Sequence, residues 1–337
     1  MIILGVSRSG TTLLKQMLDH HSEVAIPRES FFLPQLWARY RRRPDTDALL
    51  ADLECLPRIR DWGVSLEEVR RRVPPGASFT ETIATVYRVY ADSCGKPRYG
   101  EKTPQYLQHL ELLERVFPGA QYVHIVRDGR NAALSYAETH RRRRLDLTFP
   151  QGLGDFAACW RREVLDARTF GASAASGRYF ELRYEDLIAQ PEARLREVCA
   201  FLDLRFEPMM LEYHADFQSV WHPDHKRLGE PPSQGERAWR TQMPSAALER
   251  FEAIAGDALA AFGYERAHPA PSAVARARGA IGAVVSRGRV VTMGAVMPIF
   301  YRSRLWRVRQ RYLLRTRRTS RVESQSQASG AAGRAGH

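Results

Sequence analysis

Apolar residues occur along the chain either in short continuous runs or in stripes with a helical repeat. A short apolar run predicts a buried strand, and a stripe that recurs every three to four residues predicts a helix. Because the two kinds of segment alternate, the pattern predicts an α/β fold with a central parallel sheet and helices on both faces. The predicted strands are 2–6, 24–26, 121–127 and 179–184, and the predicted helices are 11–20, 104–117, 129–143, 154–172, 191–202 and 244–262.

Two stretches depart from this alternation. Residues 30–98 are charged and helical in pattern, with breaks at Pro57 and at Pro74-Pro75, and we interpret them as a helical insertion over the edge of the sheet. Residues 214–234 are rich in His, Pro and Gly, a composition that favours an ordered functional loop.

From His268 onward the chain changes in composition. Pro, Ala and Gly come first, as in a linker, and an apolar stripe among arginines follows. Such a basic amphipathic helix can lie on an anionic membrane surface, or it can pack its stripe on the folded domain and leave its arginines in water. We therefore expect a domain at 1–267, a basic linker with an amphipathic helix at 268–318, and a disordered tail at 319–337. The stripe consists of Tyr301, Leu305, Val308 and Tyr312.

The formal net charge of +13 suggests a nucleic-acid partner, but its distribution argues against one. Fourteen Arg, no Lys and one Glu lie from His268 to the end, which gives 14 − 1 = +13 and leaves residues 1–267 neutral as a whole. A nucleic-acid-binding fold should carry its positive charge on the folded surface. We predict no nucleic-acid partner, and the basic tail instead fits contact with an anionic surface.

Cysteine usage and the lengths of apolar runs bear on the compartment. The cysteines are scattered, without a CxxC pair or a His at metal-ligand spacing, so we expect buried free thiols and no metal site. No signal peptide is visible, and the apolar run Val290–Tyr301 is shorter than the roughly 18 residues that span a bilayer. These features predict a cytoplasmic protein that is peripheral to a membrane if its tail binds one. The cysteines are Cys55, Cys94, Cys159 and Cys199.

The sequence GVSRSGTT, from Gly5 to Thr12, has the spacing of a phosphate-binding loop between a strand and a helix. Backbone N–H groups in such a loop, with the positive end of the following helix, attract an anion. A tight turn without a ligand is the alternative. A nucleoside triphosphatase carries Lys where this chain has Thr11, and here the cation lies inside the loop as Arg8. No predicted strand ends in the acidic residue that helps to hold Mg²⁺, so a triphosphate ligand is poorly supported.

The chain contains four blocks of interest: RSGTTLL at 8–14 with ESFF at 29–32, EKTP at 101–104, YVHIVRDGR at 122–130 with Ser135, and RYEDL at 183–187. In this order they resemble the sulfotransferases that use 3′-phosphoadenosine 5′-phosphosulfate (PAPS), in the arginine-loop branch that includes tyrosylprotein sulfotransferases and many bacterial enzymes. The likeness extends over residues 1–266 and is loose in the insertion. It implies a P-loop-like three-layer fold and transfer of a sulfuryl group from PAPS to an acceptor hydroxyl without a metal.

The resemblance implies a role for each matched residue. Glu29 would be the general base that takes the acceptor proton, and Lys102 with Arg8 would stabilise the charge that grows on the oxygen between phosphorus and sulfur. Arg127, a forked donor at a strand end, would bind the 3′-phosphate together with Ser135. Each also has a structural alternative, such as a capping Glu, a solvated Lys or a salt-bridged Arg. The other implied donor contacts are Ser9, Gly10, Thr11 and Thr12 at the 5′-phosphosulfate, Tyr184 at the adenine, and Arg227 or Lys226 as a closing group.

The chain also departs from its apparent relatives. It has neither the loop lysine nor the histidine base of other members, and Arg28 stands where the tyrosylprotein branch often has a second acidic residue. The base could therefore be displaced by one residue, and His20 or His21 is the reserve candidate.

Two other functions and an open set of acceptors remain. The chain could be a small-molecule kinase, which would need ATP and Mg²⁺, or a non-catalytic nucleotide-binding module at a membrane. The acceptor hydroxyl could belong to a carbohydrate, a glycolipid, a lipid or a peptide, and the amphipathic tail favours a membrane-borne one. We expect the acceptor pocket between the insertion and the loop at 214–234. Its apolar wall would consist of Leu33, Leu36, Trp37 and Tyr40.

Overall fold

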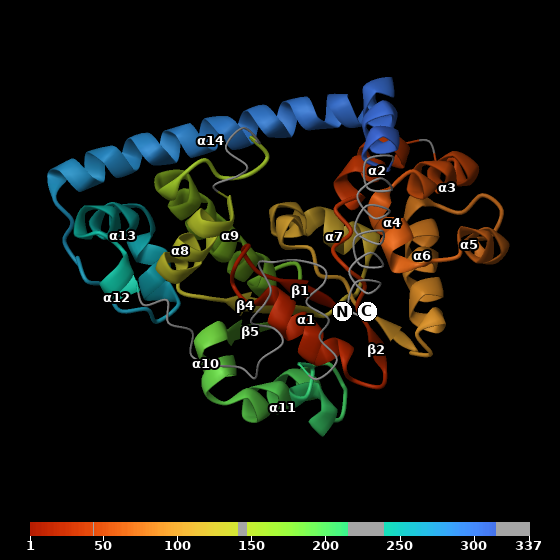
Figure 1. Cartoon of the computed structure of the whole chain (residues 1–337), viewed down its shortest axis with the longest axis horizontal. Helices are drawn as coiled ribbons and strands as arrows, with labels where there is room; N and C mark the ends of the chain where they lie inside the picture. Colours follow the sequence, from red (N-terminus) through yellow and green to blue (C-terminus); the bar gives the residue numbers. More distant parts are fainter. Residues whose placement is uncertain (43, 141–146, 215–238, 315–337) are drawn as a thin grey trace, which may run out of the picture.

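A parallel β-sheet lies between layers of helices in the middle of the molecule (Figure 1). The computed structural model describes residues 1–42, 44–140, 147–214 and 239–314. The predicted α/β architecture, with a central parallel sheet, helices on both faces and a helical insertion, is confirmed.

The strands join into one parallel array among the described residues. Three of them pair in the order β1-β4-β5, and two more form the pair β2-β3. A parallel bridge between Ile2 and Glu101 places the continuation of β3 beside β1, so the order becomes β2-β3-β1-β4-β5. The strands are β1 (Ile2–Leu4), β2 (Val24–Ala25), β3 (Arg98–Tyr99), β4 (Tyr122–Val126) and β5 (Tyr179–Arg183).

Successive side chains of a strand point to opposite faces, so each face of the sheet has its own core. Ile3, Val123 and Leu182 pack with apolar residues of the helices that cover one face, α1 and α11. Ile2 and Val126 pack in a second cluster, which includes residues of α6, α9 and α13.

The helices between β2 and β3 form the predicted insertion, which runs from α2 to α6 and carries much of the second core. The labelled helices are α1 (Thr11–Asp19), α2 (Leu33–Tyr40), α3 (Thr46–Glu54), α4 (Pro57–Trp62), α5 (Leu66–Arg72), α6 (Phe79–Ser93), α7 (Leu110–Val116), α8 (Gly129–His140), α9 (Leu153–Ala172), α10 (Tyr184–Ala189), α11 (Pro191–Phe201), α12 (Trp239–Gln242), α13 (Ser245–Ala261) and α14 (Ala273–Arg302), with 3₁₀ turns η1 (Pro104–His109) and η2 (Pro208–Leu211).

One predicted helix, at 104–117, divides into two elements. Its first part is η1, a 3₁₀ helix that starts at Pro104, and α7 follows from Leu110. His109, between them, leaves helical geometry with φ −135° and ψ 38°. The apolar spacing alone did not predict this break because it is similar in both parts.

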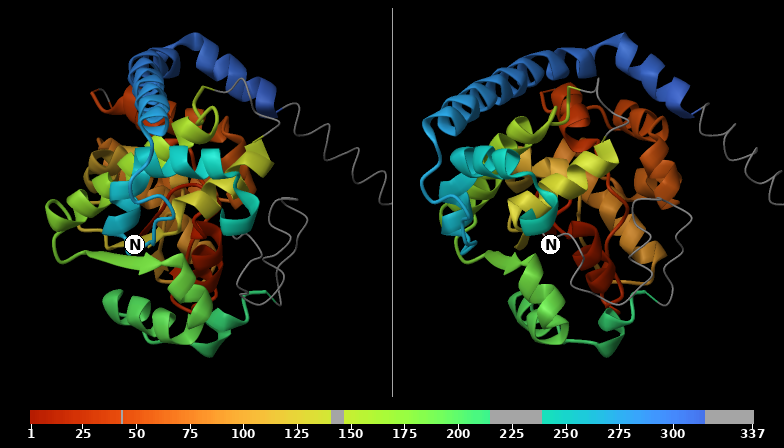
Figure 2. Two further views of the ribbon diagram at one scale, coloured as in Figure 1. Left: turned by 90° about the vertical axis from the view of Figure 1, so that its left-hand side faces the viewer. Right: turned by 60° about the vertical axis from the view of Figure 1, so that its left-hand side comes forward.

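The segment after His268, predicted to begin as a linker, is mostly helical. Helix α14 is 30 residues long and lies along the outside of the molecule, on the side opposite α10 and α11 (Figures 1 and 2). Among the described residues it alone has the length and apolar composition of a helix that could cross a membrane. Only 11% of its apolar 18-residue stretch is buried inside the protein. The sequence-based expectation that no segment reaches this length was wrong, because Gly and Thr residues interrupt the apolar run without ending the helix.

Residues 304–314 continue as a second helix after Ser303. Of the two arrangements that the sequence left open, the one in which the apolar stripe packs on the folded domain is wrong. The face that packs on the domain carries Trp306, which is fully buried and donates from Nε1 to Gln35 Oε1 at 2.7 Å. The predicted stripe points outward instead: Leu305, Val308 and Tyr312 are each more than 60% exposed. The end of the predicted segment, at 315–318, and the tail at 319–337 lie outside the described residues.

Candidate active site

Most of the predicted site residues follow the carboxyl ends of parallel strands. Arg8 follows β1, Glu29 follows β2, and Lys102 follows the stretch that extends β3 along β1. Arg127 comes directly after β4, and Tyr184 comes directly after β5. Since parallel strands end at the same edge of a sheet, the topology gathers these residues in the place where open α/β sheets bind their ligands.

The loop between β1 and α1 has the close approaches that its glycines predict. A Cβ on Gly5 would lie 2.7 Å from the carbonyl oxygen of Ile125, and Gly10 has a left-handed backbone with φ 92°. A Cβ on Gly10 would overlap the ring of Tyr184. Helix α1 begins at Thr11, so its unpaired N–H groups and positive end face the loop. The loop therefore presents a concentrated set of donors to an anion.

Arg8 lies between the two halves of the predicted donor site. It has a left-handed backbone with φ 75°, and its Nε donates to Ser135 Oγ on α8 at 2.8 Å. Arg127 donates from Nη1 to the carbonyl oxygen of Arg8 at 3.1 Å, and its guanidinium carbon lies 4.6 Å from the ring centre of Tyr184. The structure thus brings Arg8, Arg127, Ser135 and Tyr184 together. Sequence reasoning had placed Arg8 with Lys102 and did not foresee its bond to Ser135.

Two buried polar atoms at this position have no hydrogen-bond partner among the described residues. They are Ser9 Oγ, in a residue that is 1% exposed, and Arg127 Nε. A buried donor without a partner is costly, commonly by about 1–3 kcal/mol, so such atoms often mark a place for a ligand. Both residues are among those that the sequence assigned to phosphate groups.

Lys102 and Glu29 form an ion pair beside the loop. Lys102 Nζ lies 2.7 Å from Glu29 Oε1 and 3.2 Å from Thr12 Oγ1. The lysine side chain is 5% exposed, whereas that of Glu29 is 27% exposed. The ammonium group is therefore held inside the site between the loop and the carboxylate, and the carboxylate lies at its open side.

A buried network supports this pair from behind. Glu101 accepts hydrogen bonds from Tyr87 and from Thr103 Oγ1, and burial raises the pKa of Glu101 to about 7. Thr103 Oγ1 also accepts from the backbone N–H of Ser30 at 2.9 Å, and Ser30 Oγ lies 2.6 Å from Tyr106 Oη. The network links the residue after Glu29 to the residues on both sides of Lys102, so it fixes their separation.

Sequence reasoning missed this network, although its signal is present in the block Glu101-Lys102-Thr103. A carboxyl and a hydroxyl that flank a lysine at a strand end point to the opposite face from that lysine, towards the core. Tyr87, from α6, and Ser30 could not be assigned as their partners, because only the fold brings these distant segments together.

The acidic residue after β4 has a structural role. Asp128 Oδ2 lies 2.7 Å from Arg130 Nη2, and Arg130, which is 1% exposed, also pairs with Glu252 on α13 at 2.6 Å. The backbone N–H of Asp128 donates to Glu185 Oε1 at 3.1 Å. These bonds turn Asp128 towards the protein interior and leave Arg127 at the edge of the sheet.

Comparison with known proteins decides the family. Residues 1–208 match the model of the "Sulfotransferase family", a region that contains all the predicted site residues except Arg227 and Lys226. The chain belongs to the sulfotransferase family.

Curated relatives of this sulfotransferase family member include proteins from animals and bacteria. The chain is 27% identical over 222 residues to protein-tyrosine sulfotransferase A of Caenorhabditis elegans, and this alignment covers 63% of this chain and 52% of that protein. It is 25% identical over 319 residues to nodulation protein NoeE of Sinorhizobium fredii, and this alignment covers 86% of this chain and 70% of that protein. It is 30% identical over 190 residues to the omega-hydroxy-beta-dihydromenaquinone-9 sulfotransferase Stf3 of Mycobacterium tuberculosis. This alignment covers 54% of this chain and 44% of that protein. The chain thus spans about half the length of the first of these proteins.

Solved structures bear on the fold. The sulfotransferase domain of the Synechococcus PCC 7002 olefin synthase superposes with a TM-score of 0.57 at 22% identity, covering 78% of this chain and 94% of that domain. The sulfotransferase domain from the curacin biosynthetic pathway superposes with a TM-score of 0.52 at 19% identity, covering 79% and 98%. At these identities the likeness shows that the chain has the sulfotransferase fold.

The reserve bases and the predicted acceptor wall have other roles in this structure. His21 is fully buried, with Nε2 2.8 Å from the carbonyl oxygen of Arg205, and His20 Nδ1 lies 2.8 Å from the carbonyl oxygen of Gln16. The expected apolar wall belongs to the core, since Leu33, Leu36 and Tyr40 are buried and Trp37 packs on Phe79 with ring centres 5.5 Å apart. Arg227, Lys226 and the loop at 214–234 beyond His214 lie outside the described residues.

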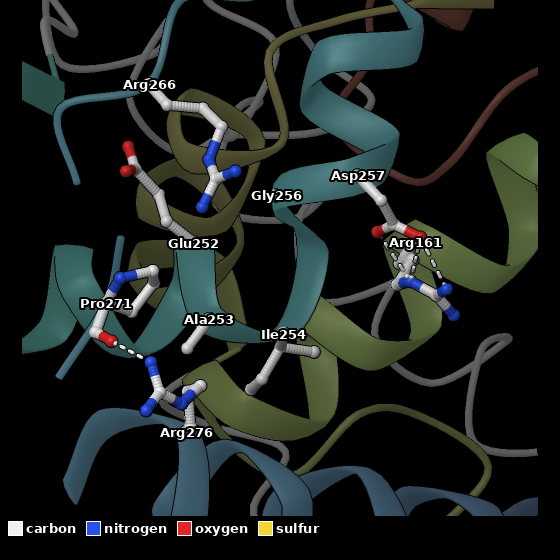
Figure 3. Close-up of a pocket in the computed structure, with 9 residues that line it drawn as sticks. All are labelled: Arg161, Glu252, Ala253, Ile254, Gly256, Asp257, Arg266, Pro271 and Arg276. Carbon is white, nitrogen blue, oxygen red and sulfur yellow. Dashed lines mark hydrogen bonds and ion pairs between the residues drawn. The ribbon is translucent and has the colours of Figure 1, made fainter. Parts of the chain in front are cut away.

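A hollow of about 360 Å³ lies away from these residues, between α9, α13 and the start of α14 (Figure 3). Its charged groups are paired within the protein: Arg161 lies against Asp257, and Arg276 donates to the carbonyl oxygen of Pro271 at 2.6 Å. None of the predicted site residues lines it. The lining residues are Arg161, Glu252, Ala253, Ile254, Gly256, Asp257, Arg266, Pro271 and Arg276.

Proposed function

We propose that this chain transfers a sulfuryl group from PAPS to the hydroxyl group of an acceptor, with Glu29 as the general base. The observation that carries the proposal is the Lys102–Glu29 ion pair, 2.7 Å long, held directly beside the phosphate loop. In this proposal the pair supplies a proton acceptor and a positive charge next to the phosphate loop at one edge of the sheet.

The residues present fit the two ends of PAPS. Ser9, with its unpaired hydroxyl, would hold the 5′-phosphosulfate together with Gly10, Thr11 and Thr12 at the start of α1. Arg127, with its unpaired Nε, would hold the 3′-phosphate together with Ser135, and Tyr184 would lie near the adenine. When bound, PAPS supplies the sulfuryl group and a phosphate that leaves with the negative charge.

Arg8 supports the same arrangement from a different position than expected. Its Nε contacts Ser135, and its carbonyl oxygen accepts from Arg127, so it connects the 3′ side of the site to the loop. Its guanidinium group therefore adds positive charge between the two anionic ends of the donor.

Glu29 and Lys102 have different roles in the proposed reaction. The half-buried carboxylate of Glu29 can take the proton as the acceptor oxygen attacks, which contributes typically a hundred- to ten-thousand-fold to a rate. Lys102, bonded to Glu29 and Thr12, holds that carboxylate in position and lies where charge develops next to the loop.

The kinase alternative has less support. Thr11 replaces the lysine of an ATP-binding loop, and Asp128, the acidic residue after β4, is bound to Arg130. Cytoplasmic location and metal-independent transfer remain part of the proposal. The free state of all four cysteines is compatible with a reducing compartment.

The acceptor belongs to the class of hydroxyl compounds. The names of two relatives specify protein tyrosine and an omega-hydroxy menaquinone derivative, and each of these acceptors carries a hydroxyl group. We extend to this chain only what the two share, a hydroxyl nucleophile.

A transfer assay tests the proposed base. The full chain is incubated with PAPS and a panel of phenolic, sugar and lipid alcohols, and release of adenosine 3′,5′-bisphosphate is followed. Glu29→Gln should lower the acceptor-dependent rate by about a hundred-fold or more, with unchanged affinity for the bisphosphate. Glu23→Gln, an exposed control in the turn before β2, should keep the wild-type rate. An equal rate for Glu29→Gln and wild type would exclude Glu29 as the base.

A further inference from the structure

The outer side of the C-terminal helices carries an exposed apolar surface in the described part of the chain. We call the exposed side chains of α14 and of the helix at 304–314 the outer C-terminal face. Large apolar residues on it are 50–71% exposed, which is unusual for so many neighbours on a soluble surface. They are Val274, Ile281, Val284, Val285, Val291, Val296, Ile299, Leu305, Val308 and Tyr312.

These residues form a stripe along the helix axis. Val274, Ile281, Val285 and Ile299 follow one another at separations of seven, four and fourteen residues, which return to nearly the same side of an α-helix. Another side of α14 packs on the protein through the small buried residues Ala275, Gly279, Gly282 and Ser286. Among the described residues, the packed side of α14 thus carries small residues, and the exposed stripe carries the large apolar ones.

Contacts at several points hold α14 lengthwise against the body. Arg289 forms a buried ion pair with Asp155 on α9 at 2.8 Å, in which both side chains are less than 10% exposed. At its far end, Arg302 Nε donates to the carbonyl oxygen of Ala38 at 2.8 Å, and Arg39 Nη1 donates to that of Tyr301 at 2.6 Å.

The helix at 304–314 has its own attachments. Trp306 is buried against α2, and Arg307 pairs with Asp52 at 2.7 Å. A helix fixed along its whole length in this way cannot cross a bilayer without breaking these contacts. It can, however, lie flat in the interface with its outer side among the lipids.

The charge of the segment specifies the surface that it fits. Residues 268–314 contain nine Arg and no Lys, Asp or Glu. Arginines flank the apolar stripe at both ends of the outer C-terminal face, among them the exposed Arg278, Arg304, Arg309 and Arg311. An anionic headgroup layer complements this charge.

We propose that the outer C-terminal face docks the protein on an anionic bilayer, with α14 in the plane of the interface. The apolar side chains enter the region below the headgroups and the flanking arginines contact lipid phosphates. The proposal is independent of the transfer chemistry, and it assigns a partner to a surface that the sulfuryl-transfer site does not use.

Vesicle co-sedimentation of the full chain tests this. The protein should bind vesicles of phosphatidylcholine mixed with phosphatidylglycerol, bind pure phosphatidylcholine much more weakly, and dissociate as salt shortens the range of electrostatic attraction. Ile281→Asp and Ile299→Asp, at positions that are 64% and 69% exposed, should each weaken binding by about ten-fold or more without a loss of helical circular dichroism. Met209→Asp, the same change at an exposed apolar residue of η2, should bind as wild type does.

A double variant that removes two arginines distinguishes binding to anionic lipids from non-specific hydrophobic association. Arg304→Ala combined with Arg309→Ala should lower affinity for the anionic vesicles only, whereas Arg115→Ala on α7 should not change it. Failure of the wild-type chain to bind anionic vesicles, or unchanged binding by both Asp variants, would overturn the proposal. So would resistance of the bound protein to carbonate extraction, which would make α14 a spanning helix. A solution dimer that the Asp variants abolish, without vesicle binding, would assign the face to a second copy of the chain.

Discussion

Lys102 and Glu101 are neighbours in sequence, but their side chains point to opposite sides of the same strand end. Lys102 faces the phosphate loop and pairs with Glu29, while Glu101 faces the core and is completely buried. The lysine and its partner could be predicted, because a charged residue after a strand of this type belongs to the edge where ligands bind. The buried carboxyl could not, because its partners Tyr87 and Thr103 are defined only by the packing of α6 against the sheet.

The raised pKa of Glu101 predicts a pH dependence of stability. Its value of about 7 in the folded protein exceeds the ordinary value of 4.5, so the folded state binds more protons than the unfolded state between these two values. The contribution of Glu101 to the free energy of unfolding should therefore fall as pH rises from about 4.5 to about 7, by roughly 3 kcal/mol.

Chemical denaturation across this pH range measures the effect. Glu101→Gln should reduce the fall, because the amide does not ionise. Burial also raises the pKa of Glu163 to about 7, so adding Glu163→Gln should reduce the fall further. His124, whose pKa burial lowers to about 3, changes the stability with pH in the opposite direction in all of these variants. An unchanged slope in the double variant would show that neither carboxyl is the cause.

At the scale of the element, the loop between β1 and α1 shows how far pattern reasoning reaches. The apolar run, the glycines and the helical stripe predicted a strand, a turn and a helix, and the structure has all three in that order. The contact of Gly10 with Tyr184 was not predictable, since it joins the loop to a residue after β5.

That contact predicts the effect of a single methyl group. Gly10→Ala would combine a left-handed backbone, φ 92°, with overlap of the Tyr184 ring, so it should lower the free energy of unfolding by about 2–4 kcal/mol and weaken bisphosphate binding. Gly63→Ala is the matched control, because Gly63 has φ 71° but nothing within 4 Å of the added carbon. It should cost only about 1 kcal/mol and leave binding unchanged. Equal losses in both variants would mean that Tyr184 does not restrict the loop.

The C-terminal elements show where the sequence is ambiguous. The segment at 268–300 is rich in Ala, Gly and Val, a composition shared by linkers and by helices that pack through small residues, and the structure has the helix. In the helix at 304–314, both Trp306 and the stripe with Leu305 satisfy helical periodicity. The choice between these faces depends on Gln35 and Asp52, which lie far away in sequence.

At the scale of the whole molecule, α14 connects the two ends of the fold. It packs on α9 and α13 near its start and on α2 near its end, so it spans the molecule from the last helix of the domain to the insertion (Figure 1). Its position was beyond sequence reasoning, because nothing local specifies which surface an Ala- and Gly-rich helix will contact.

The buried Arg289–Asp155 pair attaches the middle of α14 to the body. Arg289→Ala would leave a buried carboxylate without its cation, which should lower the free energy of unfolding by about 3 kcal/mol. Arg287→Ala, two residues earlier and exposed, should change it by less than about 0.5 kcal/mol. Denaturant titration of both variants makes the comparison, and a similar small effect for both would show that α14 is held elsewhere.

Calorimetric titration measures whether the edge of this sheet binds a nucleotide with a 3′-phosphate. Wild-type protein without added metal should bind adenosine 3′,5′-bisphosphate. Arg127→Ala should lose about ten- to a hundred-fold in affinity, as expected for a charged hydrogen bond to phosphate, while the exposed Arg115→Ala should lose none. Binding of ATP with Mg²⁺ in the absence of any response to the bisphosphate would contradict the account and favour a kinase.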